Sequence, residues 1–244
     1  MQNSALILFL LLTSSHVFAQ TNPGMQYAVC VSTARELGSQ GPNTPVLSDQ
    51  HVYALCENVT SSEEVIGCFK ELRDKGVNGP GTALISTDAV VRICARGRNQ
   101  NQRVACFLEN RTFGINGPGT PHISEAQLVT LCGRSSDAWM NTSCFAQVRT
   151  LGINGPQTEF TPGDLVVRLC SRIRTVEATV GCFNQSRTLG ALGPGSIMLD
   201  PESKVELCLG PSSANGPIDC YKMLRRPYDT FYDVRRNVLN CSRQ

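Results

Sequence analysis

Twelve cysteines recur in a fixed register along the chain, and this register constrains the fold more than any other feature of the sequence. From Cys30 to Cys208 the separations between consecutive cysteines alternate between 26 and 12 residues, and Cys220 and Cys241 end the series. The run from Cys68 to Cys106 aligns without a gap on the next 38 residues. A register kept over five copies predicts a repeat array.

The first 19 residues have the features of a secretory signal. They contain no Lys or Arg, include the apolar run LILFLLL, and close on the small residue Ala19. A buried N-terminal helix is the alternative, although the repeat has no position for it. The apolar run is too short to span a bilayer, and no later stretch is apolar enough to do so. We therefore expect a signal peptide at 1–19 and a single repeat domain at 20–244. Its units are expected at about 20–58, 59–96, 97–134, 135–172 and 173–210, with a truncated cap at 211–244.

Each unit is predicted to form two helices joined by a turn that contains Asn-Gly-Pro or Gly-Pro. The first helix carries the leading cysteine and ends at a glycine expected to have positive φ; these glycines are Gly38, Gly76, Gly114, Gly152 and Gly190. The second helix is expected to begin at a capping residue: Ser48, Ser86, Ser124, Thr161 or Asp200. Pro162 and Pro201 suit the first helical position.

A hydrophobic staple is expected at the start of each second helix. The residue before the cap is large and apolar, namely Leu47, Ile85, Ile123, Phe160 or Leu199. Its expected partners on the first helical turn are Val52, Val90, Leu128 and Leu165. Lys204 occupies the partner position in the fifth unit, so we expect a weaker cap there.

The positions of the cysteines predict how they pair. In a helical hairpin the two cysteines of a unit lie at similar distances from the turn, roughly 10 to 12 Å at 1.5 Å per residue, and so face each other. The alternative, pairing across the 12-residue intervals, would leave Cys30 and Cys241 at opposite ends of an elongated array. We predict the bridges Cys30–Cys56, Cys68–Cys94, Cys106–Cys132, Cys144–Cys170, Cys182–Cys208 and Cys220–Cys241.

These features predict an all-α fold, a right-handed solenoid-like array of six disulfide-stapled helical hairpins. An even number of cysteines behind a signal sequence also indicates an oxidising compartment. We expect a secreted or extracellular protein, periplasmic or at the cell surface if the source is bacterial. The hairpins resemble the tetratricopeptide and Sel1-like classes in architecture, and cysteine-rich secreted Sel1-like proteins likewise bridge the two helices of a unit. The Trp-Leu-Gly-Tyr-Ala signature of the first class is absent, so this resemblance assigns no functional residue.

An arginine recurs five residues after the leading cysteine in every unit. Its stem is expected to cover the aromatic ring four residues earlier, with the guanidinium on carbonyl groups at the helix end and in the turn. The alternative is a row of cations for sulfated glycan, nucleic acid or anionic lipid, with Arg73, Arg111 and Arg149 as the candidate binding residues. A net charge of only +2 and linkers of alternating sign disfavour polyanion binding at the linkers, and we expect no nucleic-acid partner.

Catalytic and metal-binding patterns are not found in the sequence. His51 and His122 fall in different units and belong to no triad or metal-ligand spacing, and every cysteine is assigned to a bridge. We expect no cofactor and no enzymatic activity. A hydrolase or inhibitor site in a groove between repeats is kept as an alternative.

Other candidate sites lie outside the constant turns. Asn58 and Asn184 are the Asn-x-Ser/Thr sites expected to point outward, whereas Asn110 is predicted on an inner face. Trp139 lies between Cys132 and Cys144, in a stretch that we treat as a linker of eleven residues. We expect it to be buried against the next layer, with an exposed contact anchor as the alternative.

Function is predicted less directly than fold. The variable linkers favour a non-catalytic recognition scaffold for an extracellular protein or glycan that uses the linker face and the grooves between layers. A structural or protective component of a matrix or coat is the alternative.

Overall fold

The computed structural model describes residues 23–95 and 99–242, and the predicted signal peptide at 1–19 lies outside them. This described part contains twelve α-helices and no extended strand. The helices are α1 (Pro23–Ala34), α2 (Asp49–Cys56), α3 (Ser62–Leu72), α4 (Thr87–Cys94), α5 (Gln100–Asn110), α6 (Glu125–Cys132), α7 (Ala138–Val148), α8 (Gly163–Cys170), α9 (Val176–Ser186), α10 (Pro201–Leu207), α11 (Gly216–Leu224) and α12 (Phe231–Cys241). The predicted array of disulfide-stapled helical hairpins is confirmed.

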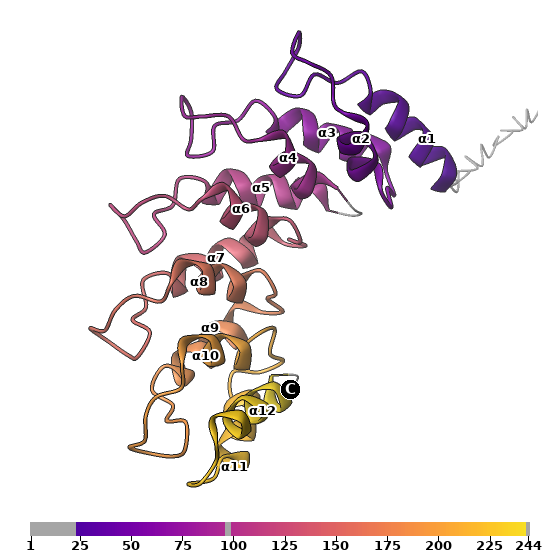
Figure 1. Ribbon diagram of the computed structural model, residues 1–244. Helices are drawn as coiled ribbons and strands as arrows, with labels where there is room; N and C mark the ends of the chain where they lie inside the picture. Colours follow the sequence, from indigo (N-terminus) through magenta and orange to yellow (C-terminus); the bar gives the residue numbers. More distant parts are fainter. Residues whose placement is uncertain (1–22, 96–98, 243–244) are drawn as a thin grey trace, which may run out of the picture.

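The helices form two parallel layers. The odd-numbered helices α1 to α11 pack successively on one another and form layer A, and the even-numbered helices α2 to α12 form layer B. Figure 1 shows the array as an arc, with the loops inside each hairpin on its outer side. The linkers between hairpins lie on the inner side. Each unit therefore contacts mainly its neighbours, as in other solenoids.

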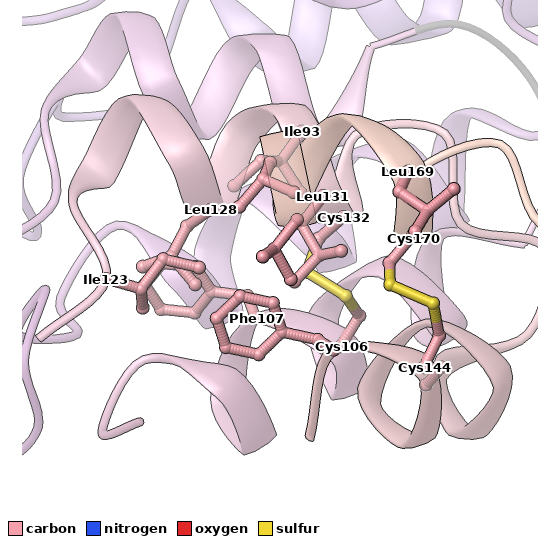
Figure 2. Packing of buried hydrophobic residues seen from close by; sticks show 14 of the residues in the cluster. Ile93, Cys106, Phe107, Ile123, Leu128, Leu131, Cys132, Cys144, Leu169 and Cys170 are labelled. Atoms are coloured by element: carbon pink, nitrogen blue, oxygen red, sulfur yellow. A yellow bond between two sulfur atoms is a disulfide. The ribbon is translucent and has the colours of Figure 1, made fainter. Parts of the chain in front are cut away.

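All six predicted disulfides are present. Their Cα–Cα distances are between 5.5 and 5.7 Å, within the range that a disulfide spans without moving the backbone. The bridges lie between the two layers and form part of the core (Figure 2). Phe107, beside the Cys106–Cys132 bridge, packs in the same cluster as Ile123 and Leu128 and is fully buried. Units two to six each combine one covalent link with one buried aromatic ring beside it: Phe69, Phe107, Phe145, Phe183 or Tyr221.

The glycine after each first helix is required for a different reason than the sequence suggested. Helix α3 ends at Leu72, and Gly76 does not have positive φ. A Cβ on Gly76 would lie 2.1 Å from the carbonyl oxygen of Gly79 and 2.5 Å from Thr82 Oγ1. Thr82 Oγ1 closes the turn by accepting from the amide of Asn78 at 3.0 Å and donating to Gly79 O at 2.8 Å. The loop folds back so tightly that no side chain fits there. Positive φ falls instead on the following glycine, at 107° for Gly79.

The predicted N-cap residue is correct for the second helix of units one, two, three and five, and it is wrong in unit four. Ser48, Ser86, Ser124 and Asp200 are side-chain N-caps. The predicted cap Thr161 is wrong, because Thr161 fills the buried staple position and donates to Leu151 O at 3.0 Å. Pro162 is the N-cap and provides no side-chain hydrogen bond. Phe160, the predicted staple residue, is 46% exposed.

Lys204 occupies a buried core position in the fifth unit. Its cap is formed nevertheless, with Asp200 accepting from the Ser203 amide at 2.9 Å. The ammonium group donates to Ile153 O at 3.0 Å and to the side-chain oxygen of Asn154, both in the loop of the preceding unit. Burial lowers the pKa of Lys204 to about 8. A charged donor here replaces apolar packing with contacts between units.

The linkers between hairpins are shorter than expected. The helices α3, α5, α7 and α9 begin at residues 62, 100, 138 and 176, so each linker has five residues, as in 57–61 and 133–137. Most of each predicted eleven-residue linker is therefore helix. The last unit differs from the others, because a short connection at 225–230 joins α11 to α12 in place of the glycine-containing loop.

Candidate functional site

The recurring arginine is the C-cap residue of the first helix in units two to six and reaches back to the preceding unit. Arg73 Nη1 donates to Gly38 O at 3.1 Å, and Arg111 Nη1 to Gly76 O at the same distance. The same contact recurs in the later units: Arg149 to Gly114 O, Arg187 to Gly152 O, and Arg225 to Gly190 O. Each guanidinium therefore ties the turn of one hairpin to the helix end of the next.

These contacts favour a structural role for the arginine row. Burial lowers the pKa of the Arg149 guanidinium, which also lies 4.7 Å from the ring centre of Phe113. In the first unit no turn precedes Arg35, and its guanidinium instead contacts Asp49 and Tyr53 at the surface. Arg73, Arg111 and Arg149 all lie at this interface between units and outside the groove described next.

A groove crosses layer B at the ends of its helices that are nearest the linkers. It has a volume of about 750 Å³ and is lined by residues of α2, α4, α6 and α8 and of the linkers that follow them. We call it the B-layer groove. Its apolar lining comes from Ala54, Val91, Ala95 and Val129. Four arginines that are exposed or half-buried also line it: Arg92, Arg134, Arg168 and Arg172. A fifth, Arg103 of α5, is buried and donates to Ile93 O and Ala95 O. The carboxylate of Glu57 lines the groove as well.

The arginines of the groove follow the register of the repeat. Arg92 and Arg168 stand two residues before the second cysteine of their units, and Arg134 and Arg172 stand two residues after it. Arg168 and Arg172 are four residues apart at the end of one helix, a spacing that places two side chains on the same face. Sequence analysis missed this site. The constant offset from the second cysteine is the signal that could have found it.

Three of these guanidinium groups are not used by the fold. Arg92, Arg134 and Arg172 are exposed and form no ion pair or side-chain hydrogen bond with any residue of 23–95 or 99–242. Arg168 differs, because it pairs with Glu206. The site therefore presents three arginines that have no partner within 23–95 and 99–242, beside an apolar surface and the carboxylate of Glu57.

The three arginines without a partner among the described residues come from the second, third and fourth units. In the first unit Ala54 and Asn58 stand at the two arginine positions, and in the fifth unit Glu206 and Gly210 do. A second groove of about 380 Å³ adjoins the first at Arg168 and lies among α8, α10 and α12. Its lining includes the carboxylates of Asp200, Glu202 and Glu206 and the guanidinium groups of Arg168 and Arg235. The B-layer groove therefore has a carboxylate at each end, Glu57 in the first linker and Glu206 on α10.

Ser48, His51 and Asp88 lie together in an arrangement that resembles a catalytic triad. His51 Nδ1 is 3.0 Å from Ser48 Oγ, and His51 Nε2 is 2.6 Å from Asp88 Oδ1. Ser48 Oγ also accepts from the His51 amide as the cap of α2.

The third unit shows what this arrangement does in the fold. There Gln127 occupies the position of the histidine, and its Nε2 donates to Asp164 Oδ1 at 2.7 Å. The backbone N–H of Gln127 donates to Ser124 Oγ, the N-cap of α6. Glutamine cannot act as a general base, yet it makes the same link between neighbouring helices. The histidine contact is thus a variant of a structural link, and it gives no support to a hydrolase.

The other predicted sites lie on separate surfaces. Trp139 is 63% exposed on α7, so its predicted burial is wrong, and its alternative role as a contact anchor stays a prediction. Asn58 is exposed in the linker after α2. Asn184 is also exposed, but its side-chain oxygen accepts from Arg187 Nη1 at 2.9 Å. Asn110 is fully buried, as its predicted inner position requires. None of these residues lines the B-layer groove.

Comparison of the chain with protein-family models, with curated proteins and with solved structures gives no match. Among the described helices, none has the length and apolar character that crossing a bilayer requires. The six disulfides are typical of an extracellular or otherwise oxidising environment.

Proposed function

We propose that this protein is a secreted, non-catalytic recognition scaffold that binds an extracellular protein or glycan through the B-layer groove. The observation that carries this proposal is the set of three arginines, Arg92, Arg134 and Arg172, which line one groove and have no partner among the described residues. Arginine is favoured at recognition surfaces because its planar guanidinium binds anionic oxygens with defined geometry.

The scaffold holds this surface in place before any ligand arrives. A disulfide fixes the two helices of each unit, and the arginine row ties each unit to the one before it. Preorganisation of this kind reduces the ordering cost of binding. The groove also crosses several units, so a ligand in it would contact several helices at once.

The proposal is tested by capture from the extracellular medium with the oxidised protein. The groove variant is Arg92→Glu/Arg134→Glu/Arg172→Glu. The matched control, Lys70→Glu/Lys222→Glu/Arg226→Glu, makes the same change in net charge at exposed residues outside the groove. We expect one partner, identified by mass spectrometry, to be retained by the native protein and the control and lost from the groove variant. Equal retention by all three would contradict recognition through the groove.

A structural or matrix role is a second candidate, and one observation favours it. Exposed apolar side chains recur on the loops within the hairpins, at or beside the residue that bridges back to the glycine. They are Val46, Leu84, Phe160, Ile197 and Met198, with exposed fractions from 42 to 88%. Sedimentation velocity over a range of protein concentrations separates the two candidates. A recognition scaffold stays monomeric, whereas a matrix component self-associates and loses this property when the loop residues are changed to Ser.

A further inference from the structure

We infer that the B-layer groove binds an extended acidic peptide segment of a partner protein. This inference rests on the proposed function and names the class of its ligand. It follows from three properties of the groove, namely the spacing of its free arginines, the apolar residues between them, and the ends of the positively charged region.

The spacing of the arginines matches a short extended chain. Arg134 and Arg172 hold the same position in successive units, and neighbouring packed helices lie about 8 to 10 Å apart. Arg92 comes from the unit before them and stands four residues earlier in the repeat. An extended peptide in the polyproline II conformation advances about 3.1 Å per residue with three residues per turn. Carboxylates at every third residue would therefore lie on one face of the peptide and recur about every 9 Å, close to the distance between units. Seven residues with acidic side chains at the first, fourth and seventh positions would span the three units.

The apolar lining favours a peptide over a ligand that is charged throughout. Val91 is almost completely buried beneath the groove, and Val129 and Ala95 are partly exposed in it. Aliphatic side chains placed between the acidic ones would pack on these residues. A sulfated glycan has no apolar groups of this kind, and its binding would use the cations alone.

The ends of the charged region also limit the ligand. At the C-terminal side the groove meets Glu206, and Glu202 lies beyond it in the adjoining groove. A long uniform polyanion lying along layer B would bring its negative charge against these carboxylates. A peptide whose acidic run is short avoids this repulsion.

The experiment measures fluorescence anisotropy with the intact oxidised protein and three labelled probes. The first probe is the peptide EVAEVAE with blocked ends, and the second is its neutral counterpart QVAQVAQ. The third is a sulfated hexasaccharide. Three proteins are compared first. They are the native chain, the groove variant Arg92→Glu/Arg134→Glu/Arg172→Glu, and the control Lys70→Glu/Lys222→Glu/Arg226→Glu. The milder variant Arg134→Gln/Arg172→Gln is included so that the result does not depend on charge reversal alone. Disulfide content and far-UV circular dichroism establish that each variant is folded.

We expect the native protein and the control to bind EVAEVAE, and the triple groove variant to bind it at least about tenfold more weakly. The neutral peptide should bind more weakly than the acidic one, and binding of the acidic peptide should weaken as salt is raised. Equal affinity of the groove variant and the native protein would overturn the inference.

Failure of this inference can be distinguished from failure of the proposed function. Tighter binding of the hexasaccharide than of the peptide, lost in the groove variant, would overturn the peptide class and leave the groove as a recognition site. If the native protein binds none of the probes but the groove variant loses the captured partner, the peptide class is again overturned and the groove is still a recognition site. The proposed function itself fails only if partner capture does not depend on the groove.

Discussion

Replacement of Arg73 by Met tests whether the arginine row holds successive units together. Methionine keeps an unbranched apolar stem but removes the guanidinium, which donates to Gly38 O at 3.1 Å across the interface between the first two units. Loss of a hydrogen bond from a charged donor costs about 1.5 to 3 kcal/mol. Because Arg73 is only partly buried, water can replace part of the contact, so we expect the lower end of that range.

The chain contains its own control for this substitution. Arg35 stands at the same position of the first unit, but its side chain is 51% exposed and pairs with Asp49 at 3.5 Å. Exposed ion pairs of this kind contribute about 0.2 to 1 kcal/mol. Arg35→Met should therefore lower the free energy of unfolding by about 0.5 kcal/mol or less, although it removes the same chemical group.

The assay is thermal unfolding of both variants followed by far-UV circular dichroism, with the disulfides intact. At about 2 to 4 °C per kcal/mol for a chain of this size, Arg73→Met should lower Tm by about 3 to 6 °C. Hydrogen exchange should also show faster exchange of the amides in the 38–46 loop. If the two variants lose the same stability within about 0.3 kcal/mol, the row does not act across the interface and the structural reasoning is wrong.

Three further predictions concern the loop glycine, the buried lysine and the disulfides. Gly76→Ala should destabilise the fold by about 1 to 3 kcal/mol, because its Cβ would lie 2.1 Å from a carbonyl oxygen. Gly67→Ala in helix α3 should stabilise the fold by about 0.5 to 1 kcal/mol, because its Cβ would meet no atom within 4 Å. Denaturant titrations measure both changes. Burial lowers the pKa of Lys204 to about 8, so the unfolded chain binds more protons than the folded chain between about pH 8 and 10. The free energy of unfolding should therefore rise with pH in that window, and Lys204→Leu should remove this rise. Removal of one bridge by Cys106→Ala/Cys132→Ala, which opens a loop with a sequence separation of 26, should cost about 3 to 4 kcal/mol, and an unchanged denaturation midpoint would contradict this estimate.

The fold could be predicted from sequence because its determinants recur at constant offsets. Cys106 and Cys132 lie at similar distances from a turn, and the first five units share a separation of 26 residues between paired cysteines, so one unit predicts the next. The same periodicity identified the arginine row. It did not identify the acceptor, because Gly38 precedes Arg73 by 35 residues and the contact depends on how two hairpins stack.

Local helix boundaries were harder to predict. Trp139 was expected in a linker, but Asp137 caps α7 by accepting from the Met140 amide and so places Trp139 in the first helical turn, facing outward. Thr161 has the chemistry of a cap, yet the repeat places it in a buried position and leaves the cap to Pro162. In both cases the position in the repeat, and not the intrinsic preference of the side chain, determines where the helix begins.

The candidate site could not be predicted by inspecting the units one at a time. The first four units each contribute between two and five residues to the B-layer groove, and Arg92, Arg134 and Arg172 are separated by about 40 residues in sequence. The arginines become one surface only when layer B is stacked. Their lack of partners is also a property of the folded chain.

The most direct test of the central claim is nuclear magnetic resonance of the folded protein during titration with EVAEVAE. Arginine Nε–Hε signals report each side chain separately, so the binding face can be located residue by residue. The account predicts shifts for Arg92, Arg134 and Arg172, with no shift for Arg73 in the arginine row or for the indole of Trp139 on layer A. Shifts confined to the arginine row or to Trp139 would contradict the assignment of recognition to the B-layer groove.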